Sequence, residues 1–164
     1  MKKALFCVVL LFVLTGAVHS QSIYDWNWAG LVRLRPLATI IPLMLGGFEI
    51  VADWVPYVSP NVGIPIEIDF AYILDIPGFG MMAGIEAVPL RHKEKSGLYI
   101  TGLAGPFFID GSVFFMARAN IGYQIVANSG FVFTPAIGAK YNSLLKKFSA
   151  DLMLDIGFAY RRRR

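Results

Sequence analysis

Two carboxylates stand inside an apolar run near the middle of the chain, in the segment VGIPIEIDFAY at residues 62–72. Glu67 and Asp69 are separated from each other by one isoleucine, and every second residue around them is large and apolar. Those apolar residues are Ile64, Ile66, Ile68, Phe70 and Tyr72. A period of two is the signature of a β-strand, whose successive side chains point to opposite faces. The segment therefore predicts a strand with one polar and one apolar face.

The same alternation recurs in other segments of the chain. In SADLMLDIGFAY, residues 149–160, the even positions are apolar, whereas Asp151 and Asp155 occupy odd ones. Three further segments divide in this way: GFEIVADWV at 47–55, SVFFMARANIGYQIV at 112–126 and FVFTPAIGAKYN at 131–142. These patterns predict a protein built from two-faced strands.

Short segments rich in turn-forming residues separate the alternating runs, at 45–47, 58–61, 75–80, 92–97, 110–111, 128–130 and 142–147. Seven such turns bound eight strands. We expect the strands at 30–41, 47–56, 62–73, 81–91, 97–108, 112–127, 131–141 and 148–160. Most of them reach the roughly 9 to 11 residues that a tilted strand needs to cross a bilayer.

The composition indicates a membrane protein, because 56% of the 164 residues are hydrophobic, 16% are charged and the mean hydropathy is +0.58. Beyond residue 20, polar residues and prolines interrupt every stretch of about 20 residues that a spanning helix would need. Only helices and closed barrels satisfy their backbone hydrogen bonds in hydrocarbon, and a carboxylate facing lipid would be costly. The predicted fold is all-β: an eight-stranded antiparallel up-and-down transmembrane β-barrel, polar inside and apolar outside.

The first 20 residues have the pattern of a cleaved signal peptide, with Lys2 and Lys3 before an apolar run and a small-residue end. The alternative is an uncleaved helical anchor. We therefore expect a signal peptide at 1–20 and an outer-membrane barrel at 21–164. The only cysteine, Cys7, lies in the signal, so the mature chain is expected to form no disulfide, and the predicted location is the bacterial outer membrane.

The phase of each strand predicts which charged side chains face the lumen. They form a polar network of Arg33, Arg35, Glu49, Asp53, Glu67, Asp69, Glu86, Arg118, Lys140, Asp151 and Asp155. Buried charges persist when they are paired, so we interpret these residues as a plug that fills a small barrel. The alternative is a narrow cation-preferring pore or small-solute channel, favoured by the excess of acidic groups.

Aromatic residues gather near the strand ends and predict a girdle at each membrane interface. The girdle residues are Trp26, Trp28, Trp54, Tyr57, Tyr72, Tyr123, Tyr141 and Tyr160. An even number of strands places both termini on the periplasmic side. The alternative is a soluble periplasmic lipid carrier with aromatic residues in its core, but the alternating carboxylates argue against it.

Eight alternating strands after a signal peptide, ending in DLMLDIGFAY with an aromatic terminus, resemble the small outer-membrane barrels of the OmpA, OmpX and OmpW type. The resemblance covers residues 29–160, and the turns at 58–61 and 128–130 are similar to those of compact spirochaete-type outer-membrane barrels of unknown function. It implies a monomeric, non-enzymatic barrel with a structural or surface role. Its expected partners are outer-membrane lipid and, during biogenesis, the barrel-assembly machinery.

Two features depart from that pattern. Tyr160 is followed by four arginines, Arg161 to Arg164, which we interpret as a basic end among lipid headgroups. The alternative is that they weaken recognition by the assembly machinery. Prolines also lie in or near the predicted strands, where each removes a backbone donor and counts against full closure. They are Pro36, Pro65, Pro89, Pro106 and Pro135.

Little in the sequence indicates catalysis. His92 lies in the charged segment RHKEKSG, and we interpret it as part of a solvated turn and not as a general base. No metal-ligand spacing or phosphate-binding loop is recognisable, so we expect no enzyme activity, cofactor or metal. Removing the signal leaves 13 basic against 11 acidic residues, and this small excess predicts no nucleic-acid partner.

Overall fold

The computed structural model describes residues 28–36, 38, 47–59, 61–73, 75–92, 96–127, 129–144 and 146–161, and they are almost entirely β-strand. The strands are β1 (Trp28–Leu34), β2 (Phe48–Ser59), β3 (Val62–Gly63), β4 (Ile66–Ile73), β5 (Ile76–His92), β6 (Ser96–Ile109), β7 (Ser112–Val126), β8 (Phe131–Asn142) and β9 (Lys147–Arg161). Within these described ranges, no helix is long and apolar enough to span a membrane. The predicted signal peptide, Trp26 and Arg162 to Arg164 lie outside them.

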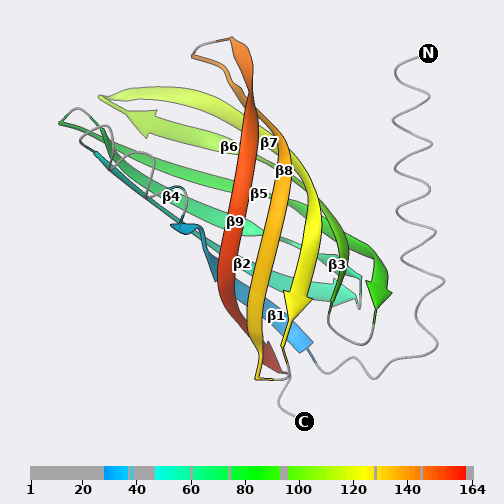
Figure 1. Ribbon diagram of the computed structural model, residues 1–164. Coiled ribbons are helices and arrows are strands. Elements are labelled where there is room, and N and C mark those ends of the chain that lie inside the picture. The colour runs from blue at the N-terminus through cyan, green and yellow to red at the C-terminus, as the bar shows by residue number, and fades with distance from the viewer. Residues whose placement is uncertain are drawn as a thin grey trace, which may run out of the picture.

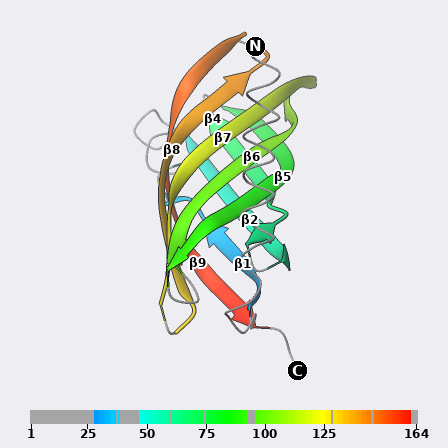
Figure 2. The same cartoon turned by 90° about the vertical axis from the view of Figure 1, so that its right-hand side faces the viewer.

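The sheet closes on itself because β1 pairs with both β2 and β9 (Figure 1). Val32 has Trp54 as its partner on one side and Phe158 on the other. β3 and β4 act as one strand interrupted at Ile64 and Pro65, since both pair with β2 and with β5. The predicted eight-stranded antiparallel closed barrel is therefore confirmed, with strands that follow one another in sequence order around the wall (Figure 2).

The two ends of the barrel are distinct. β1 begins and β9 ends at the same one, where Trp28 pairs with Arg161, and we call it the terminal end. The opposite end, called the far end, carries the turns β4–β5, β6–β7 and β8–β9. At the β6–β7 turn Asp110 and Gly111 have φ values of 47° and 70° and join the paired residues Ile109 and Ser112. This is the predicted two-residue Asp-Gly hairpin turn, which requires positive φ at both central positions.

The prediction of a first strand over 30–41 is wrong at its C-terminal side. β1 ends at Leu34, and Pro36 and Ala38 adopt a helical turn in which the Ala38 N–H donates to the Arg35 carbonyl at 3.2 Å. Pro36 has no backbone N–H to give to a ladder, and its fixed φ suits the start of a turn. Because the segment after Pro36 is apolar, its hydropathy does not indicate that the strand ends at Leu34.

The prediction of a turn over 75–80 is also wrong, because β5 begins at Ile76. The turn is tight: Ile73 pairs directly with Ile76, and Asp75 takes the positive φ of 64°. Pro77 is tolerated in the strand because it pairs with Tyr72 of β4 only, whereas pairing with β6 starts at Gly78. The glycines and the proline of this segment therefore lie in a strand and not in a loop.

The barrel accommodates its prolines at local interruptions and still closes. Pro65 lies in the break between β3 and β4, and the β5–β6 register shifts beside Pro89, between Ala87 and Leu90. The β7–β8 ladder jumps from the pair Gly122 and Ala136 to the pair Ile125 and Phe133, on either side of Pro135. Each proline is therefore placed where the ladder can do without its missing donor.

Candidate functional site: the charged barrel interior

The strand register places the predicted lumen residues on one face of the sheet. Arg33 of β1 is the cross-strand partner of Asp53 of β2, and Asp53 is the partner of Glu67 of β4. The side chains of Arg33, Arg35, Asp53, Glu67, Asp69, Glu86, Arg118 and Asp155 are at most 6% exposed. Glu49, Lys140 and Asp151 are half-buried.

Arg33 is the centre of a first cluster. Its guanidinium donates to Asp53 through Nε at 3.0 Å and Nη2 at 2.8 Å, and Nη2 also donates to Glu86 Oε2 at 2.6 Å. The same group lies over the ring of Tyr99, 5.8 Å from the centroid. One arginine thus joins two carboxylates and an aromatic face, which suits the planar fork of donors that a guanidinium presents.

Glu67 is the centre of a second cluster. It accepts hydrogen bonds from Arg118 Nη1 at 2.5 and 2.8 Å and from Arg35 Nη2 at 3.0 Å. Arg35 Nε donates to Asp155 at 2.9 Å. Arg118 Nε lies 2.7 Å from Asp151 Oδ2 and forms an ion pair with it.

These bonds run through the middle of the barrel. Arg33 and Glu86 belong to β1 and β5, and Arg118 and Glu67 belong to β7 and β4. In neither pair are the two strands neighbours in the wall. The side chains must therefore meet across the interior, so the two clusters brace the barrel from inside. Three guanidinium groups contact five carboxylates in total, which leaves the paired interior acidic.

An apolar layer closes the terminal end below the charges. We call it the terminal plug, and it consists of Leu31, Val55, Tyr57, Val126 and Val132, none more than 9% exposed. These residues come from β1, β2, β7 and β8, and β2 and β7 lie on opposite sides of an eight-stranded ring. The plug therefore spans the cross-section. The charge pattern of the sequence does not indicate this layer, because its members are apolar residues in the same phase as the inward charges.

The assignment of Tyr57 to an aromatic girdle is wrong. Its side chain is 4% exposed. Its hydroxyl accepts a hydrogen bond from Gln124 Nε2 at 3.2 Å and lies 3.4 Å from Glu86 Oε1. The reason is phase: Tyr57 is an odd position of β2, like Asp53 and Val55, and odd positions of this strand face inward. Tyr57 joins the terminal plug to the first cluster.

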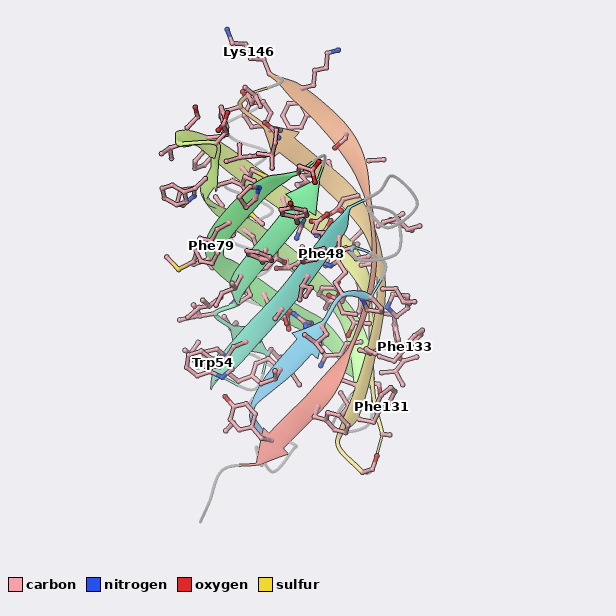
Figure 3. The ribbon with its side chains drawn as sticks, turned by 90° about the vertical axis from the view of Figure 1, so that its left-hand side faces the viewer. Phe48, Trp54, Phe79, Phe131, Phe133 and Lys146 are labelled. Carbon is pink, nitrogen blue, oxygen red and sulfur yellow. The ribbon has the colours of Figure 1, made fainter. Side chains whose placement is uncertain are left out.

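The other aromatic residues lie near the two ends of the outer wall. At the terminal end Trp54 Nε1 donates to the Tyr160 hydroxyl at 2.6 Å, and both rings are exposed (Figure 3). At the far end Phe48 stacks on Tyr72 with centroids 5.7 Å apart, and Tyr141 packs on Phe148 at 5.0 Å. Tyr123 is 39% exposed on β7. Trp28 belongs to β1, and Trp26 lies outside the described residues.

Several buried polar atoms have no partner within the described chain. They are Arg33 Nη1, Arg35 Nη1, Asp69 Oδ1, Asp155 Oδ2 and the hydroxyls of Ser59, Tyr99, Thr101 and Thr134. Asn120 joins the network when its amide is turned so that nitrogen donates to Asp151 Oδ2 at 3.2 Å. Donors and acceptors are mixed along this inner surface, which is the chemistry that holds buried water.

Two features of the described residues bear on a metal or catalytic site. No group of three or more His, Cys, Asp or Glu side chains in this part of the chain is arranged to hold a metal ion. His92, expected in a turn, is the last residue of β5 and pairs with Ser96 of β6. The predicted non-enzymatic character stays a prediction. Comparisons with protein-family models, curated proteins and solved structures find no match to the chain.

Proposed function

We propose that this chain is an integral outer-membrane β-barrel with a filled interior and a structural or surface role, without enzyme activity. The observation that carries the proposal is the inverted distribution of polarity across the wall. Every strand of the ring presents a large exposed aliphatic residue outward, whereas the paired charges lie inside. One such residue per strand is given by Val32, Ile50, Ile68, Ile85, Ile100, Ile121, Ile137 and Leu152, which are 36 to 67% exposed.

Water is a poor solvent for such a surface. Exposed apolar patches on soluble monomers rarely exceed a few hundred square ångströms, and larger ones mark an interface with protein or membrane. An apolar band that surrounds a closed barrel fits hydrocarbon, because closure leaves no backbone edge and alternation keeps the charges inside. The aromatic pairs near both ends support this assignment, because aromatic girdles flank the apolar band of membrane barrels.

The terminal plug favours a filled barrel over the alternative of a narrow pore. A conducting pore needs a continuous wet path, whereas Leu31, Val55 and Val132 are at most 1% exposed and pack together across the interior. The arginine–carboxylate bonds cross the interior above this layer, and the terminal plug is the apolar barrier. We therefore favour a closed structural barrel with lipid as its main partner, assembled as a monomer by the barrel-assembly machinery, with both termini periplasmic.

Membrane fractionation combined with heat-modifiable gel mobility tests the proposal. The folded protein should stay with the membrane pellet after carbonate washing and should migrate differently with and without boiling. Release by carbonate together with an unchanged mobility would refute it. A protein that partitions into the aqueous fraction would point instead to the soluble lipid carrier.

A further inference from the structure

We propose that the outer wall formed by β7, β8 and β9 binds one lipid with an anionic phosphate headgroup, with its acyl chain in a groove of this wall and its phosphate at Lys146 and Lys147. This inference rests on the proposed function, since it requires the wall to face lipid. It adds a specific site to that function: one part of the wall selects an anionic lipid, and the other parts contact lipid without selection.

The groove is a local depression of about 370 Å³ in the outer surface, lined almost entirely by apolar atoms. Its lining includes Ile121, Pro135, Ile137, Leu152 and Leu154. Ile137 and Leu152 are 63% and 67% exposed and stand as ridges beside it.

The cause of the depression is local. The β7–β8 ladder is interrupted beside Pro135, between the pair Gly122 and Ala136 and the pair Ile125 and Phe133. A narrow trough between aliphatic ridges fits an extended acyl chain, because it offers dispersion contacts along its length and no polar group.

The tip of the β8–β9 hairpin supplies the charge. In all three views this hairpin extends farthest from the terminal end, with Lys146 at its tip (Figure 3). Lys146, Lys147, Leu144 and Phe148 are exposed, and neither lysine forms an ion pair with another described residue. The other far-end turns carry acids, Asp75 and Asp110. Positive charge at this rim therefore lies above β8 and β9, two of the three strands that form the groove.

The spacing between tip and groove matches a lipid molecule. Lys147 and Leu152 belong to the same strand and are five residues apart, which is about 17 Å along β9. With a strand tilt of about 40°, the depth along the membrane normal is roughly 13 Å, close to the ~15 Å of hydrocarbon in one leaflet. Phe148, packed on Tyr141, lies between the two sites, where a ring suits the interface.

Anionic lipid is favoured over neutral lipid by the two lysines. A lysine near a negatively charged surface strengthens the binding of anionic lipid by about fivefold. A phosphate with net negative charge is attracted to both ammonium groups, whereas a zwitterionic headgroup brings its own cation to the same place. We therefore expect the site to concentrate anionic lipid from a mixed bilayer.

The test uses the full chain folded into phosphatidylcholine vesicles that contain about one tenth phosphatidylglycerol with brominated chains, since bromine quenches a nearby tryptophan. Phe148→Trp reports on the site, and Phe108→Trp, at the same end on β6 and 44% exposed, is the control. Both are made in a chain whose Trp26, Trp28 and Trp54 are replaced by phenylalanine, so that each reporter is the only tryptophan. Quenching at 148 should exceed quenching at 108 at least twofold. Brominated phosphatidylcholine should quench both equally.

Two variants separate the parts of the site. Lys146→Glu with Lys147→Glu should reduce quenching at 148 to the level at 108, and Leu154→Phe, which fills the groove, should reduce it with both lysines intact. The proposed lipid site would be refuted if brominated phosphatidylglycerol quenched the two positions equally, or if neither variant had an effect. Either result would leave the proposed membrane barrel intact. Absence of quenching by both brominated lipids at both positions would instead refute the proposed function.

Discussion

The hydroxyl of Tyr160 in the last strand lies directly over Gly30 in the first. A Cβ atom built on Gly30 would stand 2.5 Å from that oxygen and 2.5 Å from the carbonyl oxygen of Val55. The same hydroxyl accepts the indole N–H of Trp54 at 2.6 Å. The three residues belong to β9, β1 and β2, so this contact joins the strands that meet at the closure of the barrel. Closure thus depends on a glycine small enough to admit the tyrosine.

Gly30→Ala should therefore weaken the barrel. The added methyl group meets a backbone oxygen as well as the tyrosine, so the strand must move, with an expected loss of about 1 to 3 kcal/mol in the free energy of unfolding. Gly102→Ala is the control, because a Cβ at Gly102 meets nothing within 4 Å. The measurement is the urea midpoint in one lipid. Equal midpoints for the two variants would show that the Tyr160 contact does not limit closure.

Sequence reasoning reached the fold because one rule, alternation, acts along every strand. Glu67 and Asp69 lie on the inward face of their strand. Once the strands are paired in register, the alternation also places Asp53 and Arg118 on the inward face. It failed where one residue decides the outcome. β1 ends before Pro36, and Asp75 takes a positive φ in a tight turn that leaves Pro77 inside a strand. Neither the end of β1 nor this turn is marked by a change in the local hydropathy, so the alternation of polar and apolar residues does not reveal them.

The interior could be predicted in part. Its charged members are visible as breaks in apolar runs, but which arginine meets which acid depends on distances across the barrel that no local pattern contains. Arg33 and Glu86 are 53 residues apart in sequence. The terminal plug was not predicted, because an apolar residue such as Leu31 or Val55 is equally compatible with the outer face and with the interior. Only the phase, applied to apolar residues as strictly as to charged ones, would have shown them, and it would also have placed Tyr57 inside.

A charge on the outer wall should be costly in proportion to its depth. Ile85→Arg, in the middle of β5 and 59% exposed, should lower the free energy of unfolding by about 2 to 4 kcal/mol if the wall faces lipid. Val58→Arg, near the terminal end of β2 and 54% exposed, should cost about 0 to 1 kcal/mol. Urea midpoints in vesicles measure both. Equal, small effects would mean that water and not lipid contacts the middle of the wall.

The terminal plug should control conductance. The wild-type protein in a planar bilayer should show no steady current, because apolar side chains fill the cross-section at this level. Removing Leu31 and Tyr57 together, as Leu31→Ala and Tyr57→Ala, should open a wet path and give measurable cation current. The control is Ile50→Ala with Val58→Ala, on the outer face of β2, which should leave the protein without conductance. A robust current from the wild type would refute the closed barrel.

The last prediction concerns the ion-paired interior. Arg118 donates to Glu67 and lies 2.7 Å from Asp151, and its side chain is 2% exposed. Arg118→Met keeps much of the volume but leaves Asp151 without this arginine and Glu67 with Arg35 alone. An unpaired buried charge is the costly outcome, so the free energy of unfolding should fall by about 3 to 5 kcal/mol.

A second substitution identifies the cause of that loss. Asp151→Asn in the Arg118→Met background removes the orphaned charge and should recover part of the stability, since replacing both partners costs less than breaking the pair. Asp110→Asn, at the exposed β6–β7 turn, is the control and should leave the urea midpoint unchanged. In a wide, water-filled lumen the orphaned carboxylates would already be solvated, so Arg118→Met would change the midpoint little and Asp151→Asn would recover nothing. That pair of results would exclude the filled interior, whereas a large loss with partial recovery requires side chains that are buried and bonded to one another.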